Sequence, residues 1–117
     1  MKPEELRVRT KAFAFRIVKL FQALPKTTEA QVLGKQLLRR GTSVAANYRA
    51  ACRGRSRAEW AAKIGIFVEE SDESVFWLEM LADCGVMRNE RLKSLTDEVR
   101  ELISIFTAVQ RSARKAA

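Results

Sequence analysis

Hydrophobic residues recur every three or four positions along most of this chain, which is the period of an amphipathic α-helix. Gly41 interrupts one such stretch, which predicts a close contact between helices or a slight bend. The spacing is strictest after residue 89, where apolar residues alternate by three and four positions. These residues are Leu92, Leu95, Val99, Leu102, Phe106, Val109 and Ala113. No segment alternates as a half-buried strand would, so the pattern predicts an all-α protein.

Residues that begin and end helices divide this pattern into separate elements. Pro3 suits a first helical turn, and Leu24–Pro25 ends the first element because a residue before proline is pushed out of the helical conformation. A second helix is expected to start at Thr27 or Thr28, either of which can cap it. It is expected to end near residues 53–54, where a glycine follows an arginine.

The third helix has the clearest start. Ser56 opens a capping box, in which its side chain accepts the backbone N–H three residues on and Glu59 reaches back. Gly85 suits the left-handed position after a helix, and a fourth helix follows from about Asn89. Helices of about 20–28 residues with short connections predict a single domain over residues 1–117, an up-down-up-down four-helix bundle.

Composition narrows the class of protein. The chain is 47% hydrophobic and 31% charged, as expected for a globular protein. No apolar run approaches the roughly 20 residues of a membrane span, and the first residues contain no signal-peptide core, so we expect a cytoplasmic protein with no membrane partner. Histidine is absent, which removes the usual general base and the commonest zinc ligand. We therefore expect no enzyme activity, no cofactor and no metal site, and reduced, buried thiols at Cys52 and Cys84.

The net charge of +8 is unevenly distributed. Residues 1–26 and 27–57 carry +5 and +6, residues 58–87 carry −6, and residues 88–117 carry +3. Such asymmetry favours a nucleic-acid partner, because arginine suits phosphate contacts, or pairing between the basic helices and the acidic third helix. The candidate nucleic-acid-binding residues are Arg40, Arg49, Arg53, Arg55 and Arg57, beside the basic residues of the first helix.

Three of the predicted helices carry a second apolar stripe outside the expected core face. Its large members include Phe15 on the first helix and Phe76 and Trp77 on the third. A monomeric bundle needs one apolar stripe per helix, so the extra aromatic residues indicate an interface between copies of the chain. The alternative is that a wide stripe reflects a deep core.

Polar residues also fall at core positions. Ser71 lies in the inner stripe of the third helix, beside the acidic residues 69–73, and Ser43 and Asn47 are four positions apart on the second. A buried polar group is destabilising unless it is hydrogen-bonded, which predicts a buried network of these side chains with an arginine such as Arg40. The acidic segment is alternatively an ion-pair contact between subunits or a metal site, although carboxylate-bridged metal bundles draw acids from several helices.

Several segments resemble the bacterial four-helix-bundle proteins encoded in intervening sequences of 23S ribosomal RNA genes. These segments are Phe13 to Pro25, Leu33 to Arg40, Ser43 to Ser56, Glu59, and Glu70 to Glu73. The resemblance implies a four-helix bundle that forms a ring-shaped homopentamer. A related accessory protein of diversity-generating retroelements is a basic pentameric barrel that binds nucleic acid and a reverse transcriptase. The resemblance therefore implies self-association and favours a nucleic-acid partner.

Two functions are compatible with these features. The first is a non-enzymatic, homo-oligomeric bundle that binds the RNA or DNA backbone through its basic first and second helices. The second is a protein–protein interaction module, in which the charged blocks pair helices within and between subunits without nucleic acid.

Overall fold

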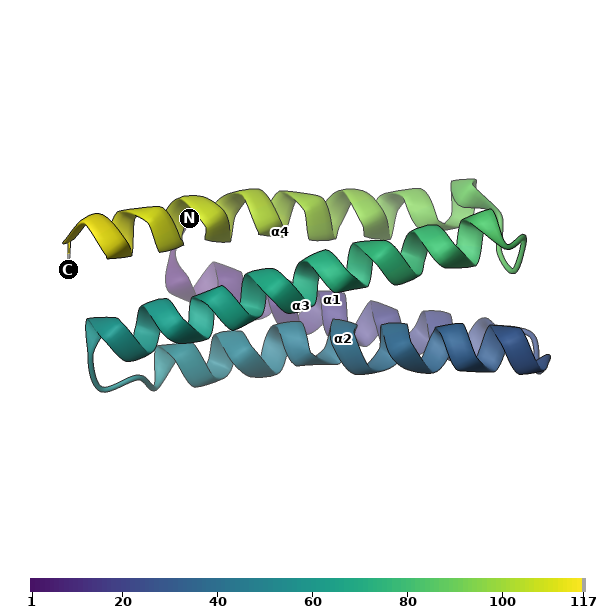
Figure 1. The fold of residues 1–117 in the computed structure, drawn as a ribbon, viewed down its shortest axis with the longest axis horizontal. Helices are drawn as coiled ribbons and strands as arrows, with labels where there is room; N and C mark the ends of the chain where they lie inside the picture. The colour runs from purple at the N-terminus through teal and green to yellow at the C-terminus, as the bar shows by residue number, and fades with distance from the viewer. Residues whose placement is uncertain (117) are drawn as a thin grey trace.

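The computed structural model describes residues 1–116, without the side chains of residues 113, 114 and 116. The helices are α1 (Pro3–Ala23), α2 (Thr28–Cys52), α3 (Arg57–Asp83) and α4 (Asn89–Ala116). They run alternately up and down in a bundle that measures 47 × 20 × 20 Å (Figure 1). The predicted all-α, four-helix fold is confirmed.

Each helix begins and ends close to the residue that the sequence predicted. Thr27 and Ser56 cap α2 and α3, and the side-chain oxygen of each accepts a backbone N–H of the first turn. The Glu59 carboxylate accepts the backbone N–H of Arg55, one residue before the cap. After α3, Gly85 has a φ of 71°, a left-handed conformation that glycine adopts without a steric penalty. Residues that cap or end a helix locally therefore set the lengths of these helices.

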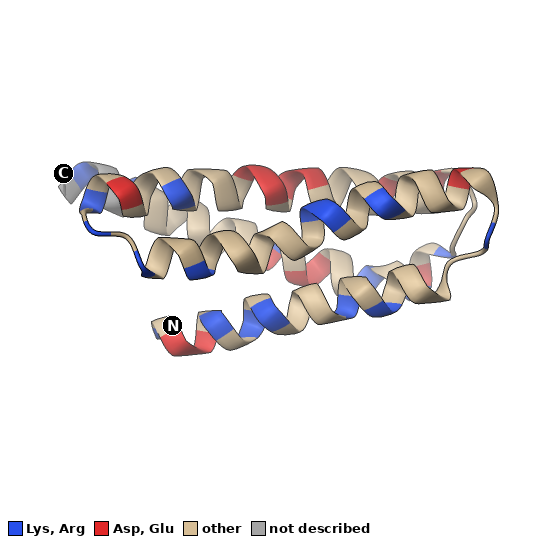
Figure 2. Ribbon diagram, turned by 90° about the horizontal axis from the view of Figure 1, so that it is seen from below, with Lys and Arg blue, Asp and Glu red and all other residues tan. Residues whose placement is uncertain are grey.

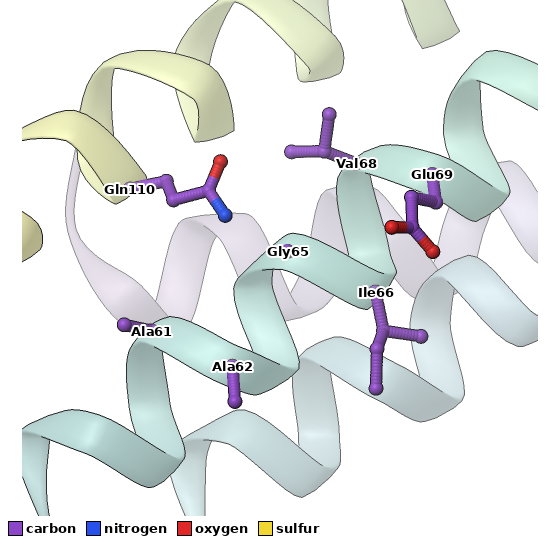
Figure 3. A pocket seen from close by; sticks show the side chains of 7 residues that line it. All are labelled: Ala61, Ala62, Gly65, Ile66, Val68, Glu69 and Gln110. Carbon is purple, nitrogen blue, oxygen red and sulfur yellow. The ribbon is translucent and has the colours of Figure 1, made fainter.

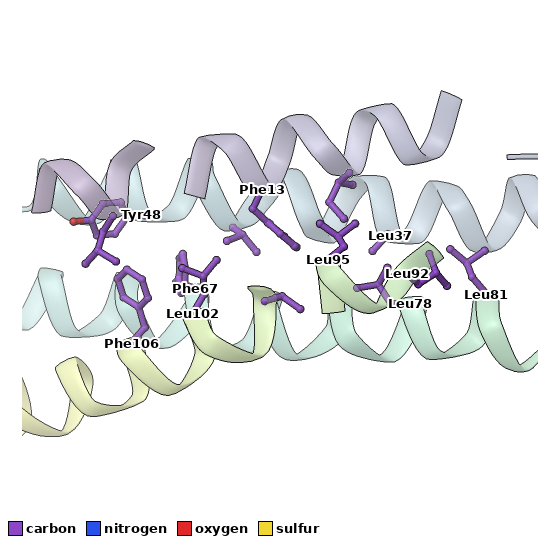
Figure 4. Packing of buried hydrophobic residues seen from close by; sticks show 14 of the residues in the cluster. Phe13, Leu37, Tyr48, Phe67, Leu78, Leu81, Leu92, Leu95, Leu102 and Phe106 are labelled. Atoms are coloured by element: carbon purple, nitrogen blue, oxygen red, sulfur yellow. The ribbon is translucent and has the colours of Figure 1, made fainter. Parts of the chain in front are cut away.

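The hydrophobic core runs along the bundle between the helices (Figure 4). At one end, the ring centroids of Tyr48, Phe67 and Phe106 lie between 4.1 and 6.3 Å apart. The Tyr48 hydroxyl donates to the Pro3 carbonyl at 3.1 Å and so joins α2 to the start of α1. The other end of the core is filled by Leu37, Leu78, Leu81 and Leu92. These residues belong to the apolar faces that the spacing predicted.

The seam between α1 and α4 is the most loosely packed in the bundle. Charged side chains bridge it: Arg9 on α1 binds Glu98 and lies 3.3 Å from Glu101, and Arg16 donates to Ser94 Oγ at 2.9 Å. The hydrogen bonds that Arg9 donates to Glu98 raise the pKa of Arg9 above its usual value. The opposite side of α1 packs closely on α2.

Both cysteines are free, but both are exposed, so the prediction of buried thiols was wrong. Cys52 is the last residue of α2 and its neighbour Ala51 occupies the core position, while Cys84 lies beyond the end of α3.

In the predicted stripe of α4, Ala113 lies outside the described side chains. None of the described helices combines the length and apolar character that a membrane crossing requires.

Candidate nucleic-acid interface

A groove of about 770 Å³ lies between α1 and α2, and basic side chains line it from both helices. Arg7 and Lys11 come from α1, Arg49 comes from the last turn of α2, and Arg53 is the residue that follows α2. All four side chains are exposed. In each pair the two cations are four residues apart, a spacing that places Arg7 and Lys11 on one face of α1, one turn after the other. The groove therefore has a row of cations on each side.

This basic groove has no counter-charge of its own. Its other lining residues are Thr10, Ala45, Ala46 and Cys52. Within the described part of the chain, no acidic side chain pairs with any of the four cations. Uncompensated like charges around a hollow repel one another and attract a multivalent anion. The groove thus has a charge and a shape that favour a multivalent anion.

Small side chains create the hollow. Ala45 and Ala46 leave space on the α2 side, and Thr10 is 1% exposed at the bottom of the α1 side. The Thr10 hydroxyl donates to a backbone carbonyl of its own helix and needs no other partner. Behind the groove, burial and a side-chain contact with Cys52 raise the pKa of Tyr48 above its usual value, so its hydroxyl stays neutral.

Arg40, a predicted nucleic-acid-binding residue, is engaged inside the chain. Its Nη1 lies 3.2 Å from Glu70 Oε1, and its Nε lies 2.6 Å from Glu73 Oε2. Two carboxylates of α3 therefore surround this guanidinium, which leaves it little attraction for a phosphate. The contacts of Arg40 are those of the alternative prediction, in which basic residues pair with the acidic third helix.

The other predicted arginines lie at the end of α2 and beyond it. Arg49 and Arg53 line the basic groove. Arg55 lies in the connection to α3, where its backbone N–H donates to Glu59, and Arg57 is the first residue of α3. Figure 2 shows basic residues on this connection and along α1, and acidic residues on α3. The structure thus gathers part of the predicted set and separates Arg40 from it.

The sequence did not single out Arg7 and Lys11 from the other basic residues of the first helix. Their spacing of four residues was visible, but Arg9 and Arg16 on the same helix are equally basic. The structure divides them: Arg9 and Arg16 turn toward α4, whereas Arg7 and Lys11 turn toward α2. The phase of these residues relative to Phe13, which is in the core, was the signal that could have separated them.

The structure does not join Ser43, Asn47 and Ser71 in the predicted polar network. Asn47 Nδ2 donates to the Ser43 carbonyl at 2.9 Å, and Ser43 Oγ donates to the Arg39 carbonyl at 2.8 Å, both within α2. Ser71 is buried on α3, and its hydroxyl has no hydrogen-bond partner among the described residues. Short polar side chains in a helix reach the carbonyl one turn earlier before they reach another helix. The polar link between α2 and α3 is made by the Arg40 ion pairs instead.

The predicted interface aromatics lie on two diagonal helices. Phe15 on α1 is 62% exposed and Phe76 on α3 is 51% exposed. Trp77 is half-buried against the core, with its ring edge-on to Phe76 at a centroid distance of 4.9 Å. The Lys19 ammonium lies 5.3 Å from the centroid of the Phe15 ring. In Figure 2, α1 and α3 form opposite edges of the bundle.

A second hollow, of about 440 Å³, lies between α3 and α4 (Figure 3). It is lined by Ala61, Ala62, Gly65, Ile66, Val68, Glu69 and Gln110. The small residues open it, and Glu69 gives it a negative charge. It lacks the paired cations of the groove between α1 and α2.

The chain is thus an α-helical bundle with a basic groove between α1 and α2. The chain belongs to the 23S rRNA-intervening sequence protein family, whose model matches residues 4–108. It is similar to a crystal structure of a protein of unknown function from the S23 ribosomal protein family of Bacteroides thetaiotaomicron. The two share 32% sequence identity over 95% of this chain and 99% of that chain, with a TM-score of 0.88. No protein with curated annotation matches the chain.

Proposed function

We propose that this protein is a non-enzymatic, cytoplasmic homo-oligomer that binds the RNA or DNA backbone through the groove between α1 and α2. One observation carries the proposal: four exposed cations from two helices share a groove that no carboxylate lines. Phosphodiester groups are the anions that clustered arginine and lysine bind in nucleic acids. Such contacts position a strand without reading its bases, so binding is independent of sequence.

Self-association is the second part of the proposal. Phe15 and Phe76 are exposed on diagonal helices, which supports a head-to-tail contact between α1 of one copy and α3 of the next. The charges agree, because residues 1–26 carry +5 and residues 58–87 carry −6. Head-to-tail contacts close into rings when the rotation between copies permits. The family resemblance implies five subunits, and each added copy contributes another basic groove to one polyanion.

A protein–protein interaction module without nucleic acid is the second candidate. The ion pairs of Arg40 with Glu70 and Glu73 favour it, because they are an instance of the charged blocks pairing two helices. On this alternative, the cations of the groove are occupied by acidic residues of a partner protein. The two candidates differ in whether the protein binds nucleic acid at low salt.

A salt titration of nucleic-acid binding tests the proposal. Fluorescence anisotropy with unrelated RNA and DNA oligonucleotides is expected to give similar affinities, and log K should fall linearly with log salt at about −0.7 to −0.9 per phosphate contact. The double variant Arg49→Glu and Arg53→Glu should weaken binding to every oligonucleotide and flatten this slope. A matched control is Arg88→Glu with Arg91→Glu, which makes the same charge change at exposed positions near the start of α4.

The outcomes separate the two candidates. Binding that is lost in the groove variant and kept in the control supports the proposed site. Equal loss in both variants would mean that net charge, and not the groove, attracts the nucleic acid. No binding by the wild-type protein at about 50 mM salt, where such contacts are strong, favours the interaction module.

A further inference from the structure

The basic groove between α1 and α2 has a geometry that suits one kind of polyanion. Arg7 and Lys11 are one turn apart on α1, and Arg53, the residue that follows the end of α2, comes four positions after Arg49. Four residues of α-helix advance about 6 Å along the axis. Consecutive phosphates along one nucleic-acid strand have a comparable separation. The groove therefore presents cations at intervals that match a single strand lying along it.

We propose that the groove holds one strand of nucleic acid, with consecutive phosphates between the two rows of cations and the bases turned toward solvent. This inference rests on the proposed function and names the form of nucleic acid that the groove accepts. It makes the protein a single-strand binder at this site, with no preference for particular bases.

The depth of the groove separates a strand from a duplex. Thr10 at its bottom is 1% exposed and Ala45 is half-buried, so the cations of α1 and α2 stand above a recessed floor. The hollow of about 770 Å³ between the two pairs of cations offers room for one sugar–phosphate chain. A duplex is wider than this hollow and touches only the outer ends of the cations. A single strand, in contrast, is contacted from both sides.

The lining of the groove also explains why bases are not read. Its uncharged members are Thr10, Ala45, Ala46 and Cys52, and none of them offers an aromatic face for stacking. Tyr48, the sole tyrosine of the protein, is 1% exposed and cannot stack on a base. Proteins that read or grip bases in single strands use exposed aromatic rings. Contact through phosphates alone gives a salt slope of about −0.7 per contact for a single strand.

The experiment blocks the hollow without changing any charge. Ala46 is exposed and lines the groove, so Ala46→Leu fills the space while all four cations remain. The matched control is Ala108→Leu, at an exposed position on α4. Anisotropy titrations compare an unstructured uridine homopolymer with a duplex of the same length, at one low salt concentration. Circular dichroism confirms that both variants are folded.

We expect the wild-type protein to bind the single strand more tightly than the duplex. Ala46→Leu should weaken strand binding by about tenfold, the effect of losing one charge-assisted contact, and should leave duplex binding unchanged. Ala108→Leu should change neither.

Other outcomes overturn the inference, and they do so separately from the proposed function. Equal binding of strand and duplex, or an equal loss for both with Ala46→Leu, would show that nucleic acid binds without entering the groove as a single strand. Failure of the wild-type protein to bind either nucleic acid would overturn the proposed function itself.

Discussion

Gly41 on α2 lies against Ile17 on α1 so closely that a β-carbon at position 41 would fall 2.7 Å from Ile17 Cγ1 and 2.9 Å from Cγ2. Ile17 is completely buried, and Gly41 is buried with it. This is the close helix contact that the interrupted stripe predicted. It brings the backbones of α1 and α2 together midway along the bundle, and so sets the register that places Arg7 beside Arg49.

Gly41→Ala is expected to destabilise the fold although alanine is the better helix former. The added methyl group would need Ile17 to move, and a β-branched side chain in a packed core has few other rotamers. Overpacking costs about 1–3 kcal/mol, while the change from glycine to alanine in a helix gains about 1 kcal/mol. We expect a net loss of up to about 2 kcal/mol in the free energy of unfolding, measured by urea denaturation.

Gly65 on α3 is the matched control for this substitution. A β-carbon there would meet only Gln110 Nε2, the end of a flexible side chain, at 2.8 Å. Gly65→Ala is expected to be neutral or to stabilise by up to about 1 kcal/mol. If Gly41→Ala proved as harmless as Gly65→Ala, the close approach of α1 and α2 at Ile17 would be wrong.

The helices and their ends could be predicted from the sequence because the signals are local. The capping residue Ser56 and the left-handed Gly85 each act within a few residues of the chain, and the core stripe repeats within each helix. The basic groove could not be predicted in the same way. Arg7 and Arg49 line one groove only because α1 and α2 pack in one register and at one rotation, which depends on contacts between distant residues.

The contacts that the predicted polar and charged residues make also depend on how distant parts of the chain pack together. Whether Arg40 faces solvent or Glu70 depends on the rotation of α3 about its axis, which the acidic segment alone does not determine. Cys52 fell on the predicted inner face, but α2 ends there and Ala51 takes the buried position. A pattern of residue types constrains which face is apolar more tightly than it constrains which polar side chains meet.

Ser71 offers a test of buried polarity in α3. Its hydroxyl is buried and has no partner among the described residues, whereas the hydroxyl of buried Ser74 donates to the Glu70 carbonyl at 2.8 Å. An unpaired buried hydroxyl costs about 1–3 kcal/mol. We expect Ser71→Ala to raise the free energy of unfolding by about 1 kcal/mol more than Ser74→Ala does.

The comparison is matched because both serines lie inside the same helix, so the gain in helix propensity is common to both substitutions. Chemical denaturation of the two variants, under identical conditions, gives the difference. An equal effect of the two substitutions would reveal that the Ser71 hydroxyl has a hydrogen-bond partner in solution.

Burial of the Tyr48 hydroxyl makes the free energy of unfolding depend on pH in the alkaline range. Burial raises the pKa of Tyr48 in the folded protein above the value of about 10 that an unfolded chain has. The folded state therefore favours the neutral phenol, and this contribution is complete below pH of about 10 and is lost as pH rises above it. Since Tyr48 is the sole tyrosine, ultraviolet absorbance of tyrosinate reports on this one group.

We expect tyrosinate absorbance in the native protein to appear only together with unfolding, at a pH above the midpoint measured in urea. Tyr48→Phe should remove this contribution and flatten the dependence of stability on pH above about 10. The same variant also loses the bond to the Pro3 carbonyl, so its stability at neutral pH should fall by about 1 kcal/mol. If Tyr48 titrated in the native protein with the same midpoint as in urea, the burial of this hydroxyl would be contradicted.

Head-to-tail assembly makes a prediction that no symmetric dimer shares. Phe15→Glu removes the proposed contact face on α1 and leaves that on α3, while Phe76→Glu does the reverse. Each variant alone has one intact face and nothing to bind it, so light scattering should give the monomer mass of 13.3 kDa for both. An equimolar mixture restores a single pair of complementary faces, and because this contact cannot propagate, the mixture should give twice the monomer mass. The wild-type protein should be larger than that, since every copy offers both faces.

If the contact were instead formed by like faces, one variant would keep the wild-type mass and mixing would change nothing. A wild-type mass of 13.3 kDa at micromolar concentration would mean that Phe15 and Phe76 are simply exposed.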